Sequence, residues 1–143
     1  MTQRSLLKAI ESDVLPILRS FGYKVSHNLE SDSFDNAVVE LTSEPLKIRF
    51  IRERGQVFLD VASTAPAAEW YDLDLVTRAL GRPRDDAYAL PASRDSIQQL
   101  ANGLISNHAK ILELLGPEGR WVDLVDRMNE LRERRSNERL GPL

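Results

Sequence analysis

Apolar residues recur at steps of three and four along the first part of the chain, which is typical of a helix with one buried face. The segment runs from Arg4 to Phe21 and its apolar positions are Leu7, Ile10, Val14, Ile17, Leu18 and Phe21. Because Pro16 lacks a backbone N–H, we expect it to kink this helix or divide it near Val14–Leu15. Gly22 follows directly and suits the left-handed position that ends many helices.

The apolar period then changes to two, the pattern of strands with one buried face. Three alternating runs joined by short polar turns predict an antiparallel meander, and a weaker fourth strand is expected at Tyr23–Asn28. The expected core positions are Ala37, Val39, Leu41, Leu46, Ile48, Phe50, Val57, Leu59 and Val61. The segments Leu29–Asn36 and Arg52–Gly55 are polar and are predicted to be a loop and a turn.

Helical spacing returns in the second half of the chain. A short helix is predicted at about Tyr71–Leu80, and Ser93 offers an N-cap for a long helix that ends at Gly116–Pro117. The apolar stripe of the long helix consists of Ile97, Leu100, Leu104, Ile111 and Leu115. A last helix at about Glu118–Arg135 should form an antiparallel hairpin with it, because the link between them is short.

These elements predict an α+β fold with an N-terminal helix, an antiparallel meander of three to four strands, a short helix and a C-terminal helical hairpin packed on the sheet. A chain of 143 residues fits one domain, which we place at residues 1–135, with 136–143 as a frayed C-terminal tail. No apolar stretch approaches the roughly 18 residues of a membrane span, and the N-terminus lacks the apolar region of a signal peptide. We therefore expect a cytoplasmic protein without membrane contact.

The composition of the chain excludes several kinds of functional site. The chain has no cysteine, which excludes disulfides, thiolate metal sites and cysteine nucleophiles. The net charge of −3, from 19 basic and 22 acidic residues, excludes a strongly basic nucleic-acid binder but leaves room for a local basic patch. Glycine-rich phosphate loops and serine-nucleophile motifs are also absent, so neither a cofactor nor a metal is expected.

The chain has two histidines. His108 lies on the apolar stripe of the long helix, and its i+3 and i+4 neighbours are Ile111 and Leu112 rather than metal ligands. We interpret His108 as a histidine at the edge of the core that forms a hydrogen bond, and His27 as a strand-end residue. Scattered carboxylates such as Asp72 and Asp74 leave a small hydrolase as the third hypothesis.

Basic residues gather in the hairpin between positions 46 and 61. Lys47 and Arg49 are predicted on the face away from the core, and the turn is predicted to add Arg52 and Arg54. Such a group is typical either of a solvated sheet face or of an electropositive strip that meets an acidic protein or a phosphate backbone.

Four large side chains could support binding at this hairpin. Ile51 and Phe58 fall on the same outer face, so either a helix covers them or they form an exposed contact patch. Trp70 and Tyr71 follow the hairpin and serve either as binding anchors or to fix a loop to the core.

The meander resembles a family of small uncharacterised bacterial α+β proteins. The resemblance covers about residues 22–81 and rests on NAVVELTS at 36–43, LKIRFIRERGQVFLDV at 46–61 and WYDL at 70–73. Many such proteins are similar to immunity proteins of bacterial toxin systems, which bind and neutralise a cognate toxin. The resemblance implies a binding function and carries no catalytic residue.

The leading hypothesis is a non-enzymatic protein-binding module, of the immunity or regulatory type, that occludes a partner protein such as a toxin with an acidic surface. Its predicted partner-binding residues are Lys47, Arg49, Arg52, Arg54, Trp70 and Tyr71. The second hypothesis is local binding of nucleic acid through the same basic strip.

Overall fold

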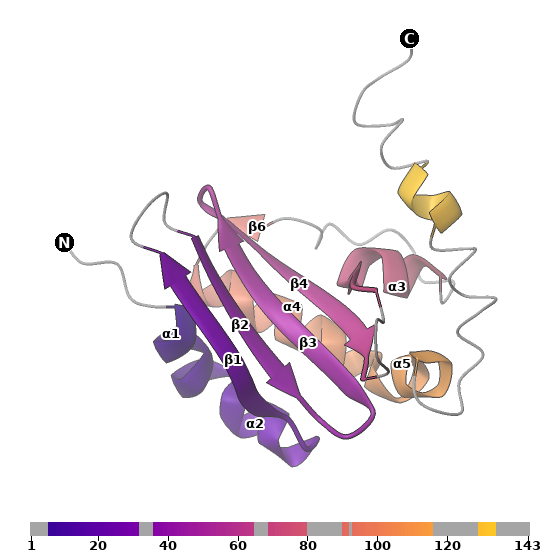
Figure 1. Ribbon diagram of the computed structural model, residues 1–143, viewed down its shortest axis with the longest axis horizontal. Coiled ribbons are helices and arrows are strands. Elements are labelled where there is room, and N and C mark those ends of the chain that lie inside the picture. Colours follow the sequence, from indigo (N-terminus) through magenta and orange to yellow (C-terminus); the bar gives the residue numbers. More distant parts are fainter. Residues whose placement is uncertain are drawn as a thin grey trace, which may run out of the picture.

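The structure is a computed structural model that describes residues 6–31, 36–64, 69–79, 90–91, 93–115 and 129–133. It has the predicted α+β fold, with a pair of N-terminal helices, an antiparallel sheet and then further helices (Figure 1). The helices are α1 (Leu6–Asp13), α2 (Leu15–Ser20), α3 (Leu73–Ala79), α4 (Arg94–Ser106) and α5 (His108–Leu115). The strands are β1 (Lys24–Ser31), β2 (Asn36–Thr42), β3 (Leu46–Glu53), β4 (Gln56–Ser63), β5 (Tyr71–Asp72) and β6 (Leu90–Pro91).

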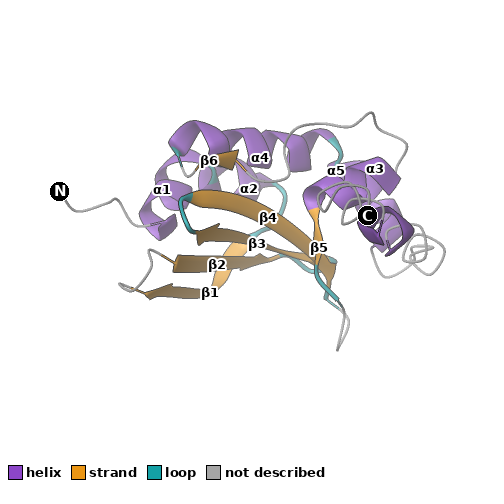
Figure 2. Cartoon of the chain, turned by 90° about the horizontal axis from the view of Figure 1, so that it is seen from above, coloured by secondary structure: helices purple, strands orange, loops and turns teal. Residues whose placement is uncertain are grey.

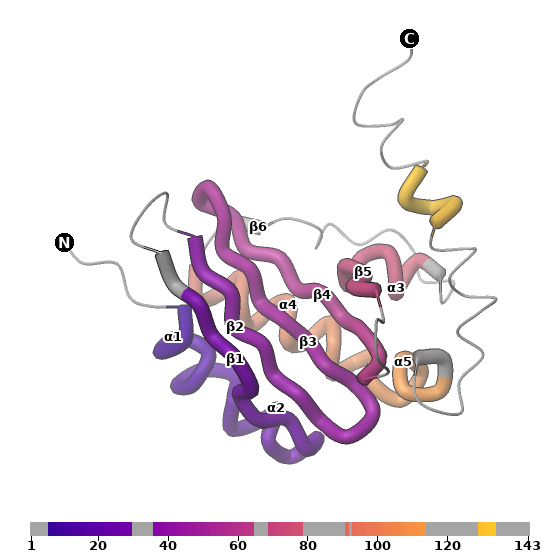
Figure 3. Tube along the Cα trace, in the orientation of Figure 1, coloured from indigo at the N-terminus to yellow at the C-terminus, as the bar shows by residue number. Residues whose placement is uncertain are grey.

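The strands follow one another across the sheet in the order β1-β2-β3-β4-β5, and β6 also pairs with β4. Figure 3 traces this meander strand by strand, with α4 running behind it. Helices α1 and α2 pack against β2 and β1, while α3 and α4 pack against β4. Figure 2 shows α1, α2 and α4 on the same side of the sheet. No described helix lies on the other side, which we call the open face.

The predicted core positions of the meander are buried on the helix side of the sheet. Tyr23 and Phe50 are the largest fully buried side chains, and α4 contributes Ile97, Leu100 and Leu104 to the same core. The alternation of apolar and polar residues therefore predicted the buried face of the three central strands correctly.

The first helix is divided as Pro16 predicts. Helix α1 ends at Asp13, Val14 has non-helical backbone angles, and Pro16 lies in the first turn of α2. Gly22 has a φ of 89° and its N–H donates to the Arg19 carbonyl, which closes α2. The expected apolar face is only partly right, because Ile17 and Phe21 are exposed after the break.

Two further predictions need correction. Strand β1 reaches Ser31, so Leu29 belongs to a strand and not to the predicted loop. The predicted long helix is broken at Asn107, whose side-chain amide donates to the Gly103 carbonyl (2.8 Å). Its N-cap is as expected, since Ser93 Oγ accepts a hydrogen bond from the Ser96 amide. The predicted hairpin link at 116–119 and the tail at 136–143 lie outside the described residues, and only 129–133 of the last predicted helix are described, as helix.

Two side-chain contacts join the N-terminal helical region to α4 and α5. Asp13 accepts two hydrogen bonds from the Arg94 guanidinium, at 2.7 and 2.6 Å. The Tyr23 hydroxyl and His108 Nε2 are 2.8 Å apart in the core. The first contact joins the end of α1 to the start of α4, and the second joins the segment between α2 and β1 to the start of α5.

A candidate binding face on the sheet

Four apolar side chains form a row across the open face. Leu29 of β1 lies opposite Val38, Val38 opposite Ile51, and Ile51 opposite Phe58. Because directly opposed residues of antiparallel strands point to the same side, these four residues cross the sheet together. Leu29 is 64% exposed and the other three are partly buried. We call Leu29, Val38, Ile51 and Phe58 the apolar row.

A charged row lies beside the apolar row. It consists of His27, Glu40, Arg49 and Asp60, one from each of the four long strands, with Asp72 of β5 opposite Asp60. Arg49 Nε and Nη2 both lie 2.9 Å from Asp60 Oδ2. Burial raises the pKa of the Asp60 carboxyl above its usual value, and the hydrogen bond and charge of Arg49 oppose that rise. The Arg49 cation is therefore matched by a fixed anion.

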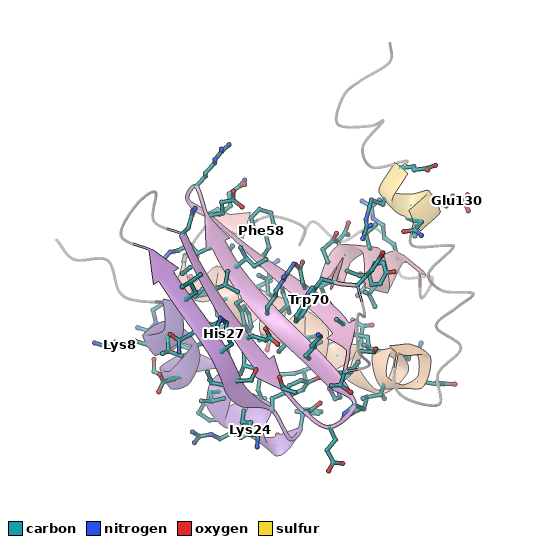
Figure 4. All side chains as sticks on the ribbon, in the orientation of Figure 1. Lys8, Lys24, His27, Phe58, Trp70 and Glu130 are labelled. Atoms are coloured by element: carbon teal, nitrogen blue, oxygen red, sulfur yellow. The ribbon has the colours of Figure 1, made fainter. Side chains whose placement is uncertain are left out.

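Trp70 lies over the basic residues of this face. Its ring centre is 4.4 Å from Arg49 Cζ and 5.0 Å from Lys47 Nζ, which are cation–π distances. Figure 4 labels Trp70, Phe58 and His27 over the strands. Lys47, Arg49 and Trp70 form one cluster, which we call the tryptophan cluster.

Tyr71 takes the opposite direction from Trp70. It lies opposite Val61, whose side chain is buried, and is itself only 5% exposed. Its hydroxyl donates to Glu69 Oε2 (3.1 Å), and the Arg132 guanidinium lies 5.2 Å from its ring centre. Burial raises the pKa of Tyr71, and Glu69 adds to that effect. Tyr71 therefore fixes β5 to the core, while Trp70 stays at the surface.

The two other predicted cations are separated from the tryptophan cluster. Arg52 lies in β3 rather than in the turn, opposite Ala37 and Val57, which are buried on the helix side. The turn consists only of Arg54 and Gly55, with φ angles of 52° and 77°. Arg54 is exposed there. The expectation of one continuous basic strip is therefore wrong, because residues 47 and 49 point to one face and residue 52 to the other.

The two histidines have different surroundings. His27 is exposed in the charged row, opposite Glu40. His108 is 6% exposed, hydrogen-bonded to Tyr23 and in edge-on contact with the Phe21 ring at 4.8 Å. Burial lowers the pKa of His108. The prediction of a hydrogen-bonded core histidine is confirmed.

The open face offers the apolar row, an indole ring and charged side chains, of which Arg49 and Asp60 form an ion pair. Such groups suit the recognition of another surface. Sequence reasoning placed Leu29 in a loop and did not single out Val38 or Glu40 as site residues, because the pairing of β1 with β2 that aligns them is not visible in the sequence. Among the described residues, no three histidines or carboxylates gather as metal ligands. In the same part of the chain, every helix is too short or too polar to cross a membrane.

Comparison with known proteins gives no relative. No protein-family model matches the sequence, and no curated protein or solved structure does so. The chemistry of the described surface is therefore the basis for any functional proposal.

Proposed function

We propose that this chain is a non-enzymatic protein-binding module, of the immunity or regulatory type, whose open face contacts another protein. The observation that supports this proposal is the tryptophan cluster beside the apolar row. Tryptophan and arginine are the residues most enriched among those that dominate binding energy at interfaces. Apolar side chains that cross four strands add a surface that a partner can shield from water.

The cations of the open face favour a protein over a nucleic acid as the partner. Binding of a phosphate backbone depends on several cations that act together. Here Arg49 is paired with Asp60, Glu40 lies in the same row, and Arg52 is on the other side of the sheet. Lys47 is stacked on Trp70 and is available to a partner carboxylate, and the exposed Lys24 lies opposite Thr42 in the same row of the face. We therefore infer a partner surface that is largely apolar and carries an acidic residue opposite Lys47.

Paired capture experiments test this proposal. The full chain is used as bait in an extract of its source cell, together with Lys47→Glu, Trp70→Ala and the matched control Arg54→Glu. All three positions are at least partly exposed, so each variant should melt close to the wild-type temperature. We expect one protein to be captured by the wild type and by Arg54→Glu, and to be lost or strongly reduced with the two open-face variants.

Two outcomes would contradict the proposal. A partner held equally by all four baits would place the interface away from the tryptophan cluster. A partner released by nuclease, with affinity that falls steeply as salt rises, would indicate nucleic acid instead.

A further inference from the structure

Strand β1 is the outer strand of the sheet, and within the described residues only β2 pairs with it. An outer strand has a row of backbone N–H and C=O groups that a further strand can bond. A bulge between Val25 and His27 interrupts the regular pairing of β1, which then continues from His27 to Ser31. The bulge and Lys24 discourage indiscriminate pairing at one end, so the regular edge available to another strand is short and defined.

A pocket lies next to the bulged end of this edge. Leu7, Glu11, Leu15 and Arg19 recur every four residues and form one stripe along α1 and α2. Together with Lys24 and Val25 of β1, this stripe lines a pocket of about 320 Å³, which we call the edge groove. Val25 lies opposite the buried Leu41, so its side chain is on the helix side of the sheet, whereas Lys24 lies opposite Thr42 on the open-face side. The edge groove is therefore at the outer edge of β1, where the helix side meets the open face.

The size and lining of the edge groove suit an aliphatic side chain. Leu7, Leu15 and Val25 supply its apolar lining. A cavity of about 150 Å³ lined by such residues takes a benzene ring, so the edge groove has room for one or two aliphatic side chains. A strand advances about 3.3 Å per residue, so a chain paired with His27 reaches Val25 within about two further residues.

The charges around the edge groove are unequal. Arg19 and Lys24 are exposed and form no ion pair within the described part of the chain, and Glu11 is the one acidic residue of the lining. An incoming acidic side chain is therefore attracted by two cations and repelled by one anion. The edge groove should therefore prefer a bound segment that carries an acidic side chain.

We propose that the edge groove binds an extended segment of another protein, which adds as a strand beside β1, places an aliphatic side chain in the pocket and an acidic side chain beside Arg19 and Lys24. Backbone hydrogen bonds to β1 would supply affinity, and the pocket and its cations would supply specificity. None of the residues that line this site belongs to the apolar row or to the tryptophan cluster, so the inference does not depend on the proposed function.

Selection from a phage-displayed library of random heptapeptides on the immobilised full chain tests the proposal. We expect enrichment of peptides with an aliphatic residue and an aspartate or glutamate within two positions of it. With the double variant Arg19→Glu, Lys24→Glu, the enriched peptides should carry lysine or arginine instead. A wild-type-selected peptide should bind this variant about tenfold more weakly or worse, because two attractive charge contacts are lost and both are replaced by repulsion.

Hydrogen exchange gives a readout that only strand addition produces. The selected peptide should slow exchange of the β1 amides that do not bond to β2, while the amides of β4 stay unchanged. The controls Lys47→Glu and Arg54→Glu should select the same peptides as the wild type, which separates this site from the open face. The double variant should melt near the wild-type temperature because both side chains are exposed.

Three results would overturn the proposal. The first is no enrichment on the folded wild type, and the second is enriched peptides whose sequences do not change with the charge reversal. The third is β1 protection that appears without peptide and rises with protein concentration, since that result would make a second copy of this chain the occupant.

Discussion

Replacing Arg49 by methionine tests how the open face balances its charges. Methionine keeps most of the aliphatic stem and removes the guanidinium, whose Nε and Nη2 both lie 2.9 Å from Asp60 Oδ2. The Asp60 side chain is 14% exposed and that of Arg49 is 31% exposed. The variant leaves a largely buried carboxylate without its cation and opposite Asp72 on the next strand.

The exposed fractions of the Arg49 and Asp60 side chains set the expected loss of stability. Breaking a fully buried ion pair costs about 3–5 kcal/mol, whereas an exposed pair contributes about 0–1 kcal/mol. The Arg49–Asp60 pair lies between these limits, so we expect the free energy of unfolding to fall by about 1.5–3 kcal/mol near neutral pH, the range for a hydrogen bond to a charged group.

The loss should depend on pH in a defined direction. Burial already raises the folded-state pKa of Asp60 above 3.8, and Arg49 limits that rise. Without Arg49 the folded pKa rises further, so the folded state holds the proton over a wider window than the unfolded state does. Stability is then lost as pH rises through that window, and the cost of the substitution should shrink toward acid pH.

Urea denaturation at about pH 7 and about pH 4 measures this loss of stability and its pH dependence. The proteins compared are the wild type, Arg49→Met, Asp60→Asn and the double variant. In the Asp60→Asn background, Arg49→Met should cost much less than in the wild type. An equal loss at both pH values, or an equal loss in both backgrounds, would refute a charge-based role for Arg49.

Three other predictions concern the core and the turns. Tyr23→Phe removes the hydroxyl partner of His108 and should lower the free energy of unfolding by about 1–3 kcal/mol. Because burial lowers the pKa of His108 below 6.5, the stability of the wild type should also fall as the pH drops below 6.5. A melting temperature that does not change with pH, together with an ordinary NMR titration of His108, would contradict this. Ser93→Ala removes the cap of α4 and should cost about 1 kcal/mol in urea denaturation, against a few tenths for Ser93→Gly, and equal losses would argue against the cap. Gly55→Ala forces a side chain into a φ of 77° and should cost about 1 kcal/mol, so an unchanged urea midpoint would mean that the turn relaxes freely.

Local signals in the sequence were sufficient for most of the fold. The division of the first helix follows from a missing N–H at Pro16, the end of α2 from the freedom of Gly22, and the start of α4 from the Ser93 hydroxyl. Each of these effects acts within one helical turn, so a single sequence carries it. Alternation likewise predicted the buried face of the central strands because the side chains of a strand point to opposite faces in turn.

The placement of Arg52 shows where pattern reasoning failed. Leu46, Ile48 and Phe50 alternate toward the core, and the same alternation continued by one step places Arg52 with them. The cluster of charges from Arg52 to Gly55 resembles a turn, but only Arg54 and Gly55 make it, with Arg54 in a left-handed conformation that few non-glycine residues adopt. Because the turn has only two residues, Arg52 remains in β3 and points to the helix side, while Arg54 lies in the turn.

The candidate site depended on pairings that no local signal specifies. Trp70 reaches Lys47 and Arg49 because β5 pairs with β4 at Asp60 and Val61. The apolar row depends on how β1 aligns with β2 beyond the bulge. Both are properties of the assembled sheet, and they became visible only when its register was known.

The sheet order has a consequence for the lifetime of the folded chain. Strands β1 to β5 are neighbours both in sequence and in space, so the meander can close through short loops, which favours early formation. The Asp13–Arg94 and Tyr23–His108 contacts join residues 81 and 85 positions apart and should form after the folding barrier is crossed. Stopped-flow measurements on Asp13→Ala and Tyr23→Phe should then show faster unfolding with an almost unchanged folding rate, whereas slower folding would place these contacts in the nucleus. On this view the sheet sets how fast the protein folds, and two side-chain pairs between the N-terminal helical region and α4 and α5 set how long it stays folded.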